Sequence, residues 1–287
     1  MLIGAHVSTA GGLDKAVGRG EELGCEAIQI FNQSPRMWKP TAYAEEDFAA
    51  FREAMEASPV ESVIIHAVYL INCATPDREL AKKSRDSLAH ALRIGDAIGA
   101  DGVVLHPGAR KDSEPGPAMK RAGKVIRAAL DDTEECPILI EQMAGHKGIL
   151  GCTFEEVETI TEAAGGSDRI GLCLDSCHMF VSGYDVRTEE SLSAVLAEID
   201  SVLGLERLGA LHVNDSKVPF GSKKDRHEDL GKGEIGDRSL SVILSEPAFE
   251  GLPATLETPG PDKKGPTAAD VAHAKKLRKR GLKNRSR

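Results

Sequence analysis

The sequence lacks any run of about 20 apolar residues, the length that a membrane-spanning helix needs, although 41% of its 287 residues are hydrophobic. Its start, Met1 to His6, has neither the basic region nor the long apolar segment of a secretory signal. We therefore expect a cytoplasmic protein with no membrane partner. Repeats, low-complexity tracts and linkers are absent too, so nothing divides the chain into several domains.

The cysteines are too few and too dispersed to predict a fold that is held together by disulfides. Six cysteines are spread from Cys25 to Cys177 in a chain long enough to bury a core without disulfides. We expect free thiols. Cys173 and Cys177 flank Asp175, so a thiolate metal ligand is conceivable. However, Cys173 should point away from a site at Asp175 because side chains alternate along a strand.

Most of the chain also lacks an excess of positive charge. The formal net charge is −9, but residues 273–287 hold eight of the 36 basic residues and no acidic one, which leaves −17 for the rest. An acidic body argues against a broad phosphate-binding face, although bound divalent ions would reverse the sign locally. The basic end favours a nearby polyanion, and a frayed, solubilising terminus is the equally open alternative.

Short apolar runs alternate with helix-like stretches along the whole chain. The runs that predict strands are residues 2–6, 27–31, 62–66, 102–106, 137–141, 170–175, 208–213 and 253–257. Eight strands, each followed by a crossover, match a single (β/α)8 TIM barrel in number and total length. A doubly wound open sheet is the alternative, because alternation alone does not show closure. We expect the barrel to cover residues 1–272 and residues 273–287 to form a flexible basic tail.

Histidine or acidic residues end the third to the eighth predicted strands. They are His66, His106, Glu141, Asp175, His212 and Glu257. Any one of them could be an ordinary loop or capping residue, but the joint pattern lies at the barrel face where active sites form. His178 follows Asp175 at a spacing of three. Asp225 and His227 lie two residues apart, on one side of an extended segment, in a long irregular stretch over residues 214–235.

These nine side chains predict a metal cluster at the C-terminal face of the strands. Imidazole and carboxylate ligands suit zinc or manganese better than an iron–sulfur centre. Nine candidates exceed the roughly three protein ligands of a catalytic zinc, so two or three ions fit if one carboxylate bridges. Clustered metal ions favour phosphoester cleavage, because they activate a water and neutralise phosphate oxygens.

The chain resembles the endonuclease IV family of apurinic/apyrimidinic (AP) endonucleases in segments that extend from residue 2 to about residue 260. The match in the long loop is especially specific. The segments are Gly4-Ala5-His6-Val7-Ser8, His66-Ala67-Val68-Tyr69-Leu70-Ile71-Asn72, His106-Pro107-Gly108, Leu172-Cys173-Leu174-Asp175-Ser176-Cys177-His178, Gly183-Tyr184-Asp185, His212-Val213-Asn214-Asp215-Ser216-Lys217, Asp225-Arg226-His227-Glu228-Asp229-Leu230-Gly231-Lys232-Gly233 and Leu256-Glu257-Thr258.

The resemblance implies three zinc ions per chain, with manganese an option at one position. The three sites would be formed by His66, His106 and Glu141, by Glu141, Asp175, His212 and Glu257, and by His178, Asp225 and His227. Glu141 would bridge two ions, and Glu141, Asp175 and Glu257 would be catalytic. The implied enzyme is a hydrolase of base excision repair that cuts duplex DNA 5′ to an abasic site and leaves a 3′-hydroxyl and a 5′-deoxyribose phosphate. DNA with 3′-blocked damage is a further expected partner.

The resemblance also implies three DNA contacts. Arg36, Tyr69 and Leu70 align with residues that enter the duplex at the lesion, where a wedge offsets the cost of flipping a nucleotide. Ordinary packing after the third strand is the alternative for Tyr69 and Leu70. Nothing in the sequence suggests an obligate protein partner, so we expect a monomer.

Two other functions are compatible with part of this pattern. A sugar isomerase or epimerase on the same barrel would use a metal tetrad that Glu141, Asp175, His212 and Glu257 could supply. Such a one-metal enzyme would not need the other five candidates. A catalytically dead DNA-binding module is the second alternative, and the complete ligand set argues against it.

Overall fold

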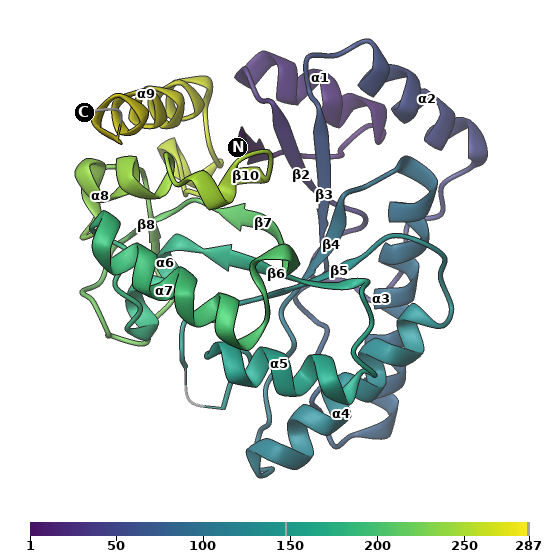
Figure 1. The fold of residues 1–287 in the computed structure, drawn as a ribbon. Coiled ribbons are helices and arrows are strands. Elements are labelled where there is room, and N and C mark those ends of the chain that lie inside the picture. Colours follow the sequence, from purple (N-terminus) through teal and green to yellow (C-terminus); the bar gives the residue numbers. More distant parts are fainter. Residues whose placement is uncertain (147, 286–287) are drawn as a thin grey trace.

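Eight parallel strands close into a barrel in the computed structural model of the protein, which describes residues 1–146 and 148–285 (Figure 1). The barrel strands are β1 (Leu2–His6), β2 (Ala27–Phe31), β3 (Ser62–His66), β4 (Gly102–Leu105), β5 (Ile138–Glu141), β6 (Ile170–Asp175), β7 (Leu208–His212) and β10 (Pro253–Leu256). Their order is β1-β10-β7-β6-β5-β4-β3-β2, and β1 pairs with both β10 and β2. Closure confirms the predicted TIM barrel and excludes the open sheet. Each predicted strand is present, with ends that differ by at most one residue.

Helices surround the barrel (Figure 1). They are α1 (Asp14–Leu23), α2 (Glu45–Glu56), α3 (Arg78–Ile98), α4 (Pro115–Leu130), α5 (Phe154–Ala163), α6 (Ser176–Ser182), α7 (Glu189–Val202), α8 (Gly236–Ile243) and α9 (Ala268–Arg285), with short 3-10 turns η1 (Leu205–Arg207), η2 (Pro247–Phe249) and η3 (Pro261–Lys263). Local sequence sets several boundaries. The side chains of Asp77, Thr153 and Thr188 accept hydrogen bonds from the first turns of α3, α5 and α7, and Gly99 ends α3 in the left-handed conformation.

Two apolar layers hold the barrel together. The large one lies between the strands and the helices and includes Phe51, Phe154 and Phe249, all fully buried. The small one is formed by the inward-facing side chains of β3 to β7, which are Ile64, Val104, Leu139, Cys173 and Ala210. This inner layer fills the barrel and forms the floor under its C-terminal mouth.

The chain between β7 and α8 contains a short antiparallel pair, β8 (Asp215–Ser216) with β9 (His227–Glu228). The carboxylate of Asp215 is completely buried and accepts hydrogen bonds from the backbone N–H groups of Ser216, Gly231, Gly233, Ile235 and Gly236. One side chain therefore gathers both ends of this loop, and β9 is held beside β8 at the mouth of the barrel.

The basic C-terminal segment continues a helix. The boundary expected at residues 272 and 273 falls inside α9, which packs against α8 and buries Val271, Ala274 and Leu277. Arg278 binds Glu250, which also binds the Met1 amino group just before β1. The structure thus differs from the expected flexible tail through Arg285, because apolar contacts and ion pairs fix it at the N-terminal end of the barrel. Residues 286 and 287 of the expected tail lie outside the described residues.

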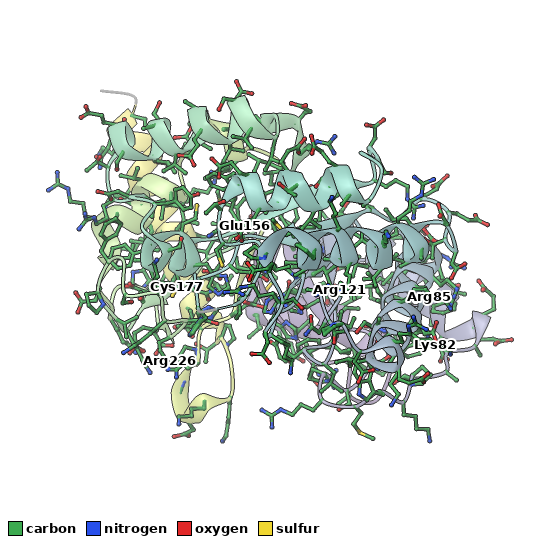
Figure 2. The ribbon with its side chains drawn as sticks, turned by 90° about the horizontal axis from the view of Figure 1, so that it is seen from below. Lys82, Arg85, Arg121, Glu156, Cys177 and Arg226 are labelled. Atoms are coloured by element: carbon green, nitrogen blue, oxygen red, sulfur yellow. The ribbon has the colours of Figure 1, made fainter. Side chains whose placement is uncertain are left out.

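Other surface charges pair along single helices. On α3, Lys82 and Arg85 both bind Asp86, at an edge of the molecule well separated from Cys177 and Arg226 (Figure 2). Among the helices of residues 1–146 and 148–285, none is both long and apolar enough to cross a membrane.

Candidate metal centre

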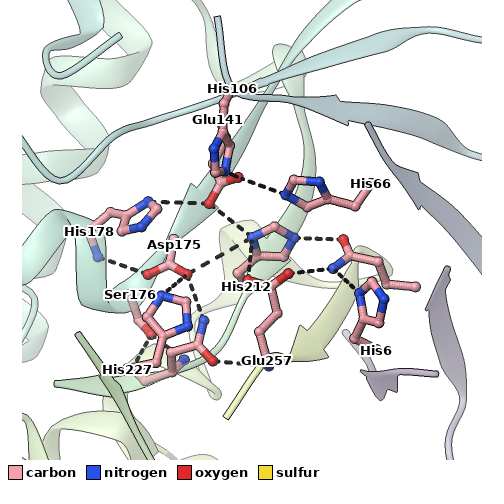
Figure 3. A network of polar contacts seen from close by, with 12 residues as sticks. His6, His66, His106, Glu141, Asp175, Ser176, His178, His212, His227 and Glu257 are labelled. Atoms are coloured by element: carbon pink, nitrogen blue, oxygen red, sulfur yellow. Dashed lines mark hydrogen bonds and ion pairs between the residues drawn. The ribbon is translucent and has the colours of Figure 1, made fainter. Parts of the chain in front are cut away.

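The barrel floor explains why the predicted ligands converge. Five of the predicted ligands follow an inner-layer residue by two positions, so their side chains point to the same inner face, nearer the C-terminal mouth of the barrel. They are His66, His106, Glu141, Asp175 and His212. Glu257 follows the buried Thr255 of β10 in the same way. Figure 3 shows the resulting ring of imidazoles and carboxylates at the mouth of the barrel.

The structure brings all nine predicted ligands together in three groups, two of which share Glu141. In each group the potential ligand atoms lie within 4.8 Å of one another. The groups are His66, His106 and Glu141; Glu141, Asp175, His212 and Glu257; and His178, Asp225 and His227. Their composition equals that of the three expected sites.

Glu141 belongs to two of these groups, and its two oxygens face different neighbours. Oε2 lies 2.8 Å from Nε2 of His106 and 3.6 Å from Nε2 of His66. Oε1 lies 3.0 Å from Nδ1 of His212 and 3.2 Å from Nδ1 of His178. A carboxylate in this position can bridge two cations, one on each oxygen.

Backbone carbonyls orient two of the imidazoles. His66 donates through Nδ1 to the carbonyl of Ala67 at 2.7 Å, and His178 donates through Nδ1 to the carbonyl of Gln142 at 2.9 Å. Because a carbonyl only accepts, the other nitrogen of each ring is left to face the cluster. This arrangement is typical of histidines that bind metals.

Unpartnered buried atoms support cation binding. Oε2 of Glu141 and the Nε2 atoms of His178 and His227 are buried and make no well-formed hydrogen bond with the described residues, because their near neighbours are other candidate ligands. Buried polar atoms without partners are costly, so three of them at one spot indicate a site built to bind a ligand. Imidazole nitrogens and carboxylate oxygens in groups of three or four are a donor set that fits zinc or manganese.

In the metal-free protein, neighbouring opposite charges shift the pKa values of the candidate ligands. Burial alone would raise the pKa of Glu141, but His212 and His106 outweigh it and hold that pKa well below its ordinary range. Burial alone would lower the pKa of His178, but the charge of Asp175 and the adjacent carboxylate of Asp225 raise it well above its ordinary range. The site therefore strongly favours positive charge beside its carboxylates.

The third group depends on the loop after β7. Asp225 and His227 come from this loop, and Oδ1 of Asp225 lies 3.1 Å from Nε2 of His227. Oδ2 of Asp225 lies 3.4 Å from Nε2 of His178, which comes from α6. His227 also approaches Oδ2 of Asp175 at 3.6 Å, so the third group touches the second.

The expected direction of Cys173 is wrong. Cys173 lies in the inner layer of the barrel, because residues two apart on β6 share a face and Asp175 also points inward. Cys177 is the thiol nearest the third group, with Sγ within 4.8 Å of ligand atoms of Asp175 and His227. Burial raises the pKa of Cys173 to about 11 and that of Cys177 to about 12, so both are protonated thiols. All six cysteines are free, as expected.

The three residues expected to contact DNA lie in different surroundings. Tyr69 is 54% exposed, and its ring lies 5.1 Å from that of His66 and 5.9 Å from that of His106. Leu70 is half-buried and packs against the large apolar layer, so packing accounts for part of its role. Arg36 is exposed on the loop after β2, and neighbouring residues of that loop line a cleft of about 950 Å3 beside the ligands.

Sequence reasoning missed the polar residues that support the ligands. Asn214 donates to Oδ2 of Asp175 at 2.6 Å and accepts from the backbone N–H of Glu257 at 3.0 Å. Gln29 on β2 contacts His212 and Glu257 from inside the barrel. Neither residue ends a strand, so a search of strand ends passes over both. Gln29 could have been found from the alternation of side chains along β2, which places it on the inner face of the barrel.

Comparisons with known proteins agree with this arrangement. A family profile described as xylose isomerase-like TIM barrel matches residues 17–280. The protein named Probable endonuclease 4 from Methanoculleus marisnigri is 38% identical over 279 residues, which cover 96% of this chain and 99% of that protein. The corresponding protein of Halothermothrix orenii is 37% identical over 260 residues and covers 90% of this chain and 94% of its own.

Solved structures show the same likeness. The crystal structure of endonuclease IV from Thermus thermophilus matches with a TM-score of 0.83 and 34% identity, and covers 99% of this chain and 100% of its own. D-psicose 3-epimerase from Clostridium cellulolyticum H10, solved with D-tagatose, matches with a TM-score of 0.65 and 12% identity over 99% of this chain and 98% of its own. At that identity the epimerase shows a shared fold alone.

Proposed function

This chain belongs to the endonuclease IV family of xylose isomerase-like TIM barrels, and from that premise we propose that it is a metal-dependent AP endonuclease of DNA repair. We propose further that it hydrolyses the phosphodiester bond 5′ to an abasic site in duplex DNA and leaves a 3′-hydroxyl and a 5′-deoxyribose phosphate. The observation that carries this proposal is the convergence of nine candidate ligands in three adjoining groups.

The ligands would hold three divalent ions, with zinc as the first choice and manganese an option at one position. Metal ions bound here would supply an activated water, neutralise phosphate oxygens and stabilise the leaving oxygen. Glu141 would connect two of the sites through its separate oxygens. Asp175 and Glu257 would complete the second site, and the pair Asp225 and His227 would bring the third from the loop.

Charge around the site supports a polyanionic substrate. Lys217 and Arg226 line the cleft that holds the ligands, and Lys263 and Lys264 line the neighbouring cleft. These cations lie at the mouth of the barrel, although the body of the chain is acidic. Phosphate attraction by such side chains does not depend on sequence. The exposed ring of Tyr69 lies on the wall of both clefts and offers an aromatic surface for a base or sugar at the lesion.

A sugar isomerase is the main alternative, because Glu141, Asp175, His212 and Glu257 do form one group. The additional group of His178, Asp225 and His227 argues against it, since a one-metal enzyme has no use for that group. A DNA-binding module without activity would not need to keep buried ligand atoms unpartnered.

One experiment tests the proposal against both alternatives. The purified protein is assayed for incision of a duplex that contains a tetrahydrofuran abasic analogue, and the same sample is analysed for metals. We expect incision on the 5′ side and about three zinc ions per chain. One manganese or cobalt ion without incision would indicate the isomerase. Specific binding of the abasic duplex without incision would indicate the binding module.

A further inference from the structure

The strands β1 and β2 contribute no residue to the three groups, yet the inner face of β2 carries a fully buried amide, Gln29. We propose that Gln29 is a positioning residue of the metal centre, which sets the nitrogen that His212 presents and the oxygen that Glu257 presents. This inference rests on the proposed role of His212 and Glu257 as ligands.

The first contact selects the nitrogen of His212. Oε1 of Gln29 lies 2.7 Å from Nε2 of His212, and an amide oxygen can only accept, so Nε2 carries the hydrogen. Nδ1 faces the cluster and lies 3.0 Å from Oε1 of Glu141 and 3.4 Å from Oε2 of Glu257 (Figure 3). It donates to a carboxylate when no metal is bound, and it is the nitrogen that a cation in the second group would bind. Backbone carbonyls orient His66 and His178 in the same manner, whereas His212 depends on a side chain that a mutation can remove.

The second contact selects the oxygen of Glu257. Nε2 of Gln29 donates to Oε1 of Glu257 at 2.6 Å, a charge-assisted bond that leaves Oε2 to face the cluster. Both contacts come from one amide group. If the amide turned over, its NH2 group would meet the N–H of His212 and its oxygen would meet a carboxylate. Only one orientation therefore satisfies both neighbours, and it fixes both ligands together.

A third contact holds Gln29 itself. Nε2 of Gln29 also lies 3.0 Å from Nδ1 of His6 at the end of β1, whose ring packs on Phe31 at 4.5 Å. Burial lowers the pKa of His6 to about 4, so its ring is neutral and Nδ1 can accept the second hydrogen of the amide. His6 lines the cleft of about 950 Å3. The two strands without ligands, β1 and β2, thus provide the residues that hold His212 and Glu257 in place.

The test measures metal affinity without DNA. Gln29→Met keeps the length of the side chain and removes its hydrogen bonds. The control is Thr161→Val, since Thr161 on α5 is also buried and its hydroxyl donates to the carbonyl of Val157 at 2.9 Å, away from the three groups. Zinc-loaded protein is titrated with a chelator, and the zinc retained per chain is counted.

We expect Gln29→Met to release one zinc ion at a chelator concentration about 10- to 100-fold lower than the wild type does, with the other ions unaffected. Its kcat for the abasic duplex should fall while KM stays unchanged. Thr161→Val should lose thermal stability and keep the wild-type chelator curve. A wild-type curve for Gln29→Met would overturn the inference.

Gln29→Glu decides the question if the methionine variant does not fold. It keeps the size of the side chain and the acceptor for His212, but replaces the donor to Glu257 with a second carboxyl. We expect it to fold and to lose the same ion, and retention of all the zinc would contradict the inference. A wild-type protein that binds no zinc would instead refute the proposed function, because that result does not depend on Gln29.

Discussion

Oδ2 of Asp215 accepts a hydrogen bond from the backbone N–H of Gly231 at 3.0 Å, and this contact closes the loop that carries Asp225 and His227. Four further backbone N–H groups of the loop bind the same carboxylate. The third group thus depends on a residue that is not one of its members. The loop is long, but its position is set by a buried acceptor.

Asp215→Asn should loosen this loop. The amide loses one acceptor oxygen, and each backbone N–H left without a partner costs about 1–3 kcal/mol. We expect faster hydrogen exchange at Gly231 and Gly233 and loss of one metal ion per chain, the ion that Asp225 and His227 would hold. Asp229→Asn is the control on the same loop, because the carboxylate of Asp229 accepts one backbone N–H, that of Gly260, together with Lys232. Equal exchange rates in the two variants would contradict the assigned role of Asp215.

Glu257→Gln should abolish incision of the tetrahydrofuran duplex. The substitution removes a negative charge from the second metal group and keeps the shape of the side chain, so the fold should stay intact. Activity and circular dichroism of the same sample measure the two effects. Undiminished activity would refute the assignment of Glu257 to the cluster.

Tyr69→Ala should weaken binding of the abasic duplex more than it weakens the fold. Tyr69 is 54% exposed beside the ligands, and a stacked base contributes about 1–3 kcal/mol to binding. Tyr184→Ala is the control, since Tyr184 is half-buried against Phe154 outside both clefts. That variant should lose thermal stability and keep its affinity. The prediction fails if the two variants bind the duplex equally well.

The metal-free protein should be most stable in mildly acidic solution. Burial alone would raise the pKa of Glu257, but His212 and His66 lower it from 4.5 to about 2, so its stabilising effect is present above pH 4.5 and is lost toward pH 2. Burial alone would lower the pKa of His227, but Asp175 and Asp225 raise it from 6.5 to about 9. The stability from protonated His227 is therefore present below pH 6.5 and is lost toward pH 9.

Thermal unfolding of chelator-treated protein measures this effect. Its melting temperature should fall between pH 6.5 and pH 9. Zinc should bind more tightly over the same interval and release protons, because metal binding requires neutral imidazoles. Constant proton release across that interval would contradict the predicted titration of His227.

Basic residues of α9 should contribute little to DNA binding, in contrast to the polyanion contact that the sequence composition suggests. This end of α9 lies at the N-terminal end of the barrel, opposite the ligands, where Arg278 and Arg285 bind Glu250 and Glu246. Removal of residues after 272 should mainly destabilise the fold, since burial of a leucine such as Leu277 contributes about 1.5–3 kcal/mol.

Point substitutions separate stability from charge. A double change of the exposed Lys276 and Lys279 to Gln should leave the salt dependence of DNA binding unchanged. The same change at Lys263 and Lys264 in the cleft wall should make DNA affinity less dependent on salt. The slope of log affinity against log salt concentration should fall by about one for each phosphate that the side chains no longer neutralise. The reverse result would restore the polyanion interpretation of the C-terminal end.

Seven of the nine ligands were predictable because each ends or closely follows an apolar run, and strand ends meet on one face of a barrel. Asp225 and His227 follow no such run, and they were candidates because of their spacing of two in a long irregular stretch. Gln29 could not be found in this manner, because its partners His212 and Glu257 lie far along the chain. Helix α9 was missed because few apolar residues, among them Val271 and Leu277, mark its buried side among many charges.

The hydrogen bond between Gln29 and Glu257 also has a consequence for the order of folding. β1 lies between β2 and β10 in the barrel. The hydrogen bond therefore connects the first part of the chain with the last strand, at the place where the barrel closes. Contacts between residues so distant along a chain form late, because the entropy of closing the intervening loop opposes them. A cation bound by Glu257 would then stabilise the closed barrel where β1 meets β10. We expect its removal to appear first as faster hydrogen exchange along β1 and β10, before the rest of the barrel opens.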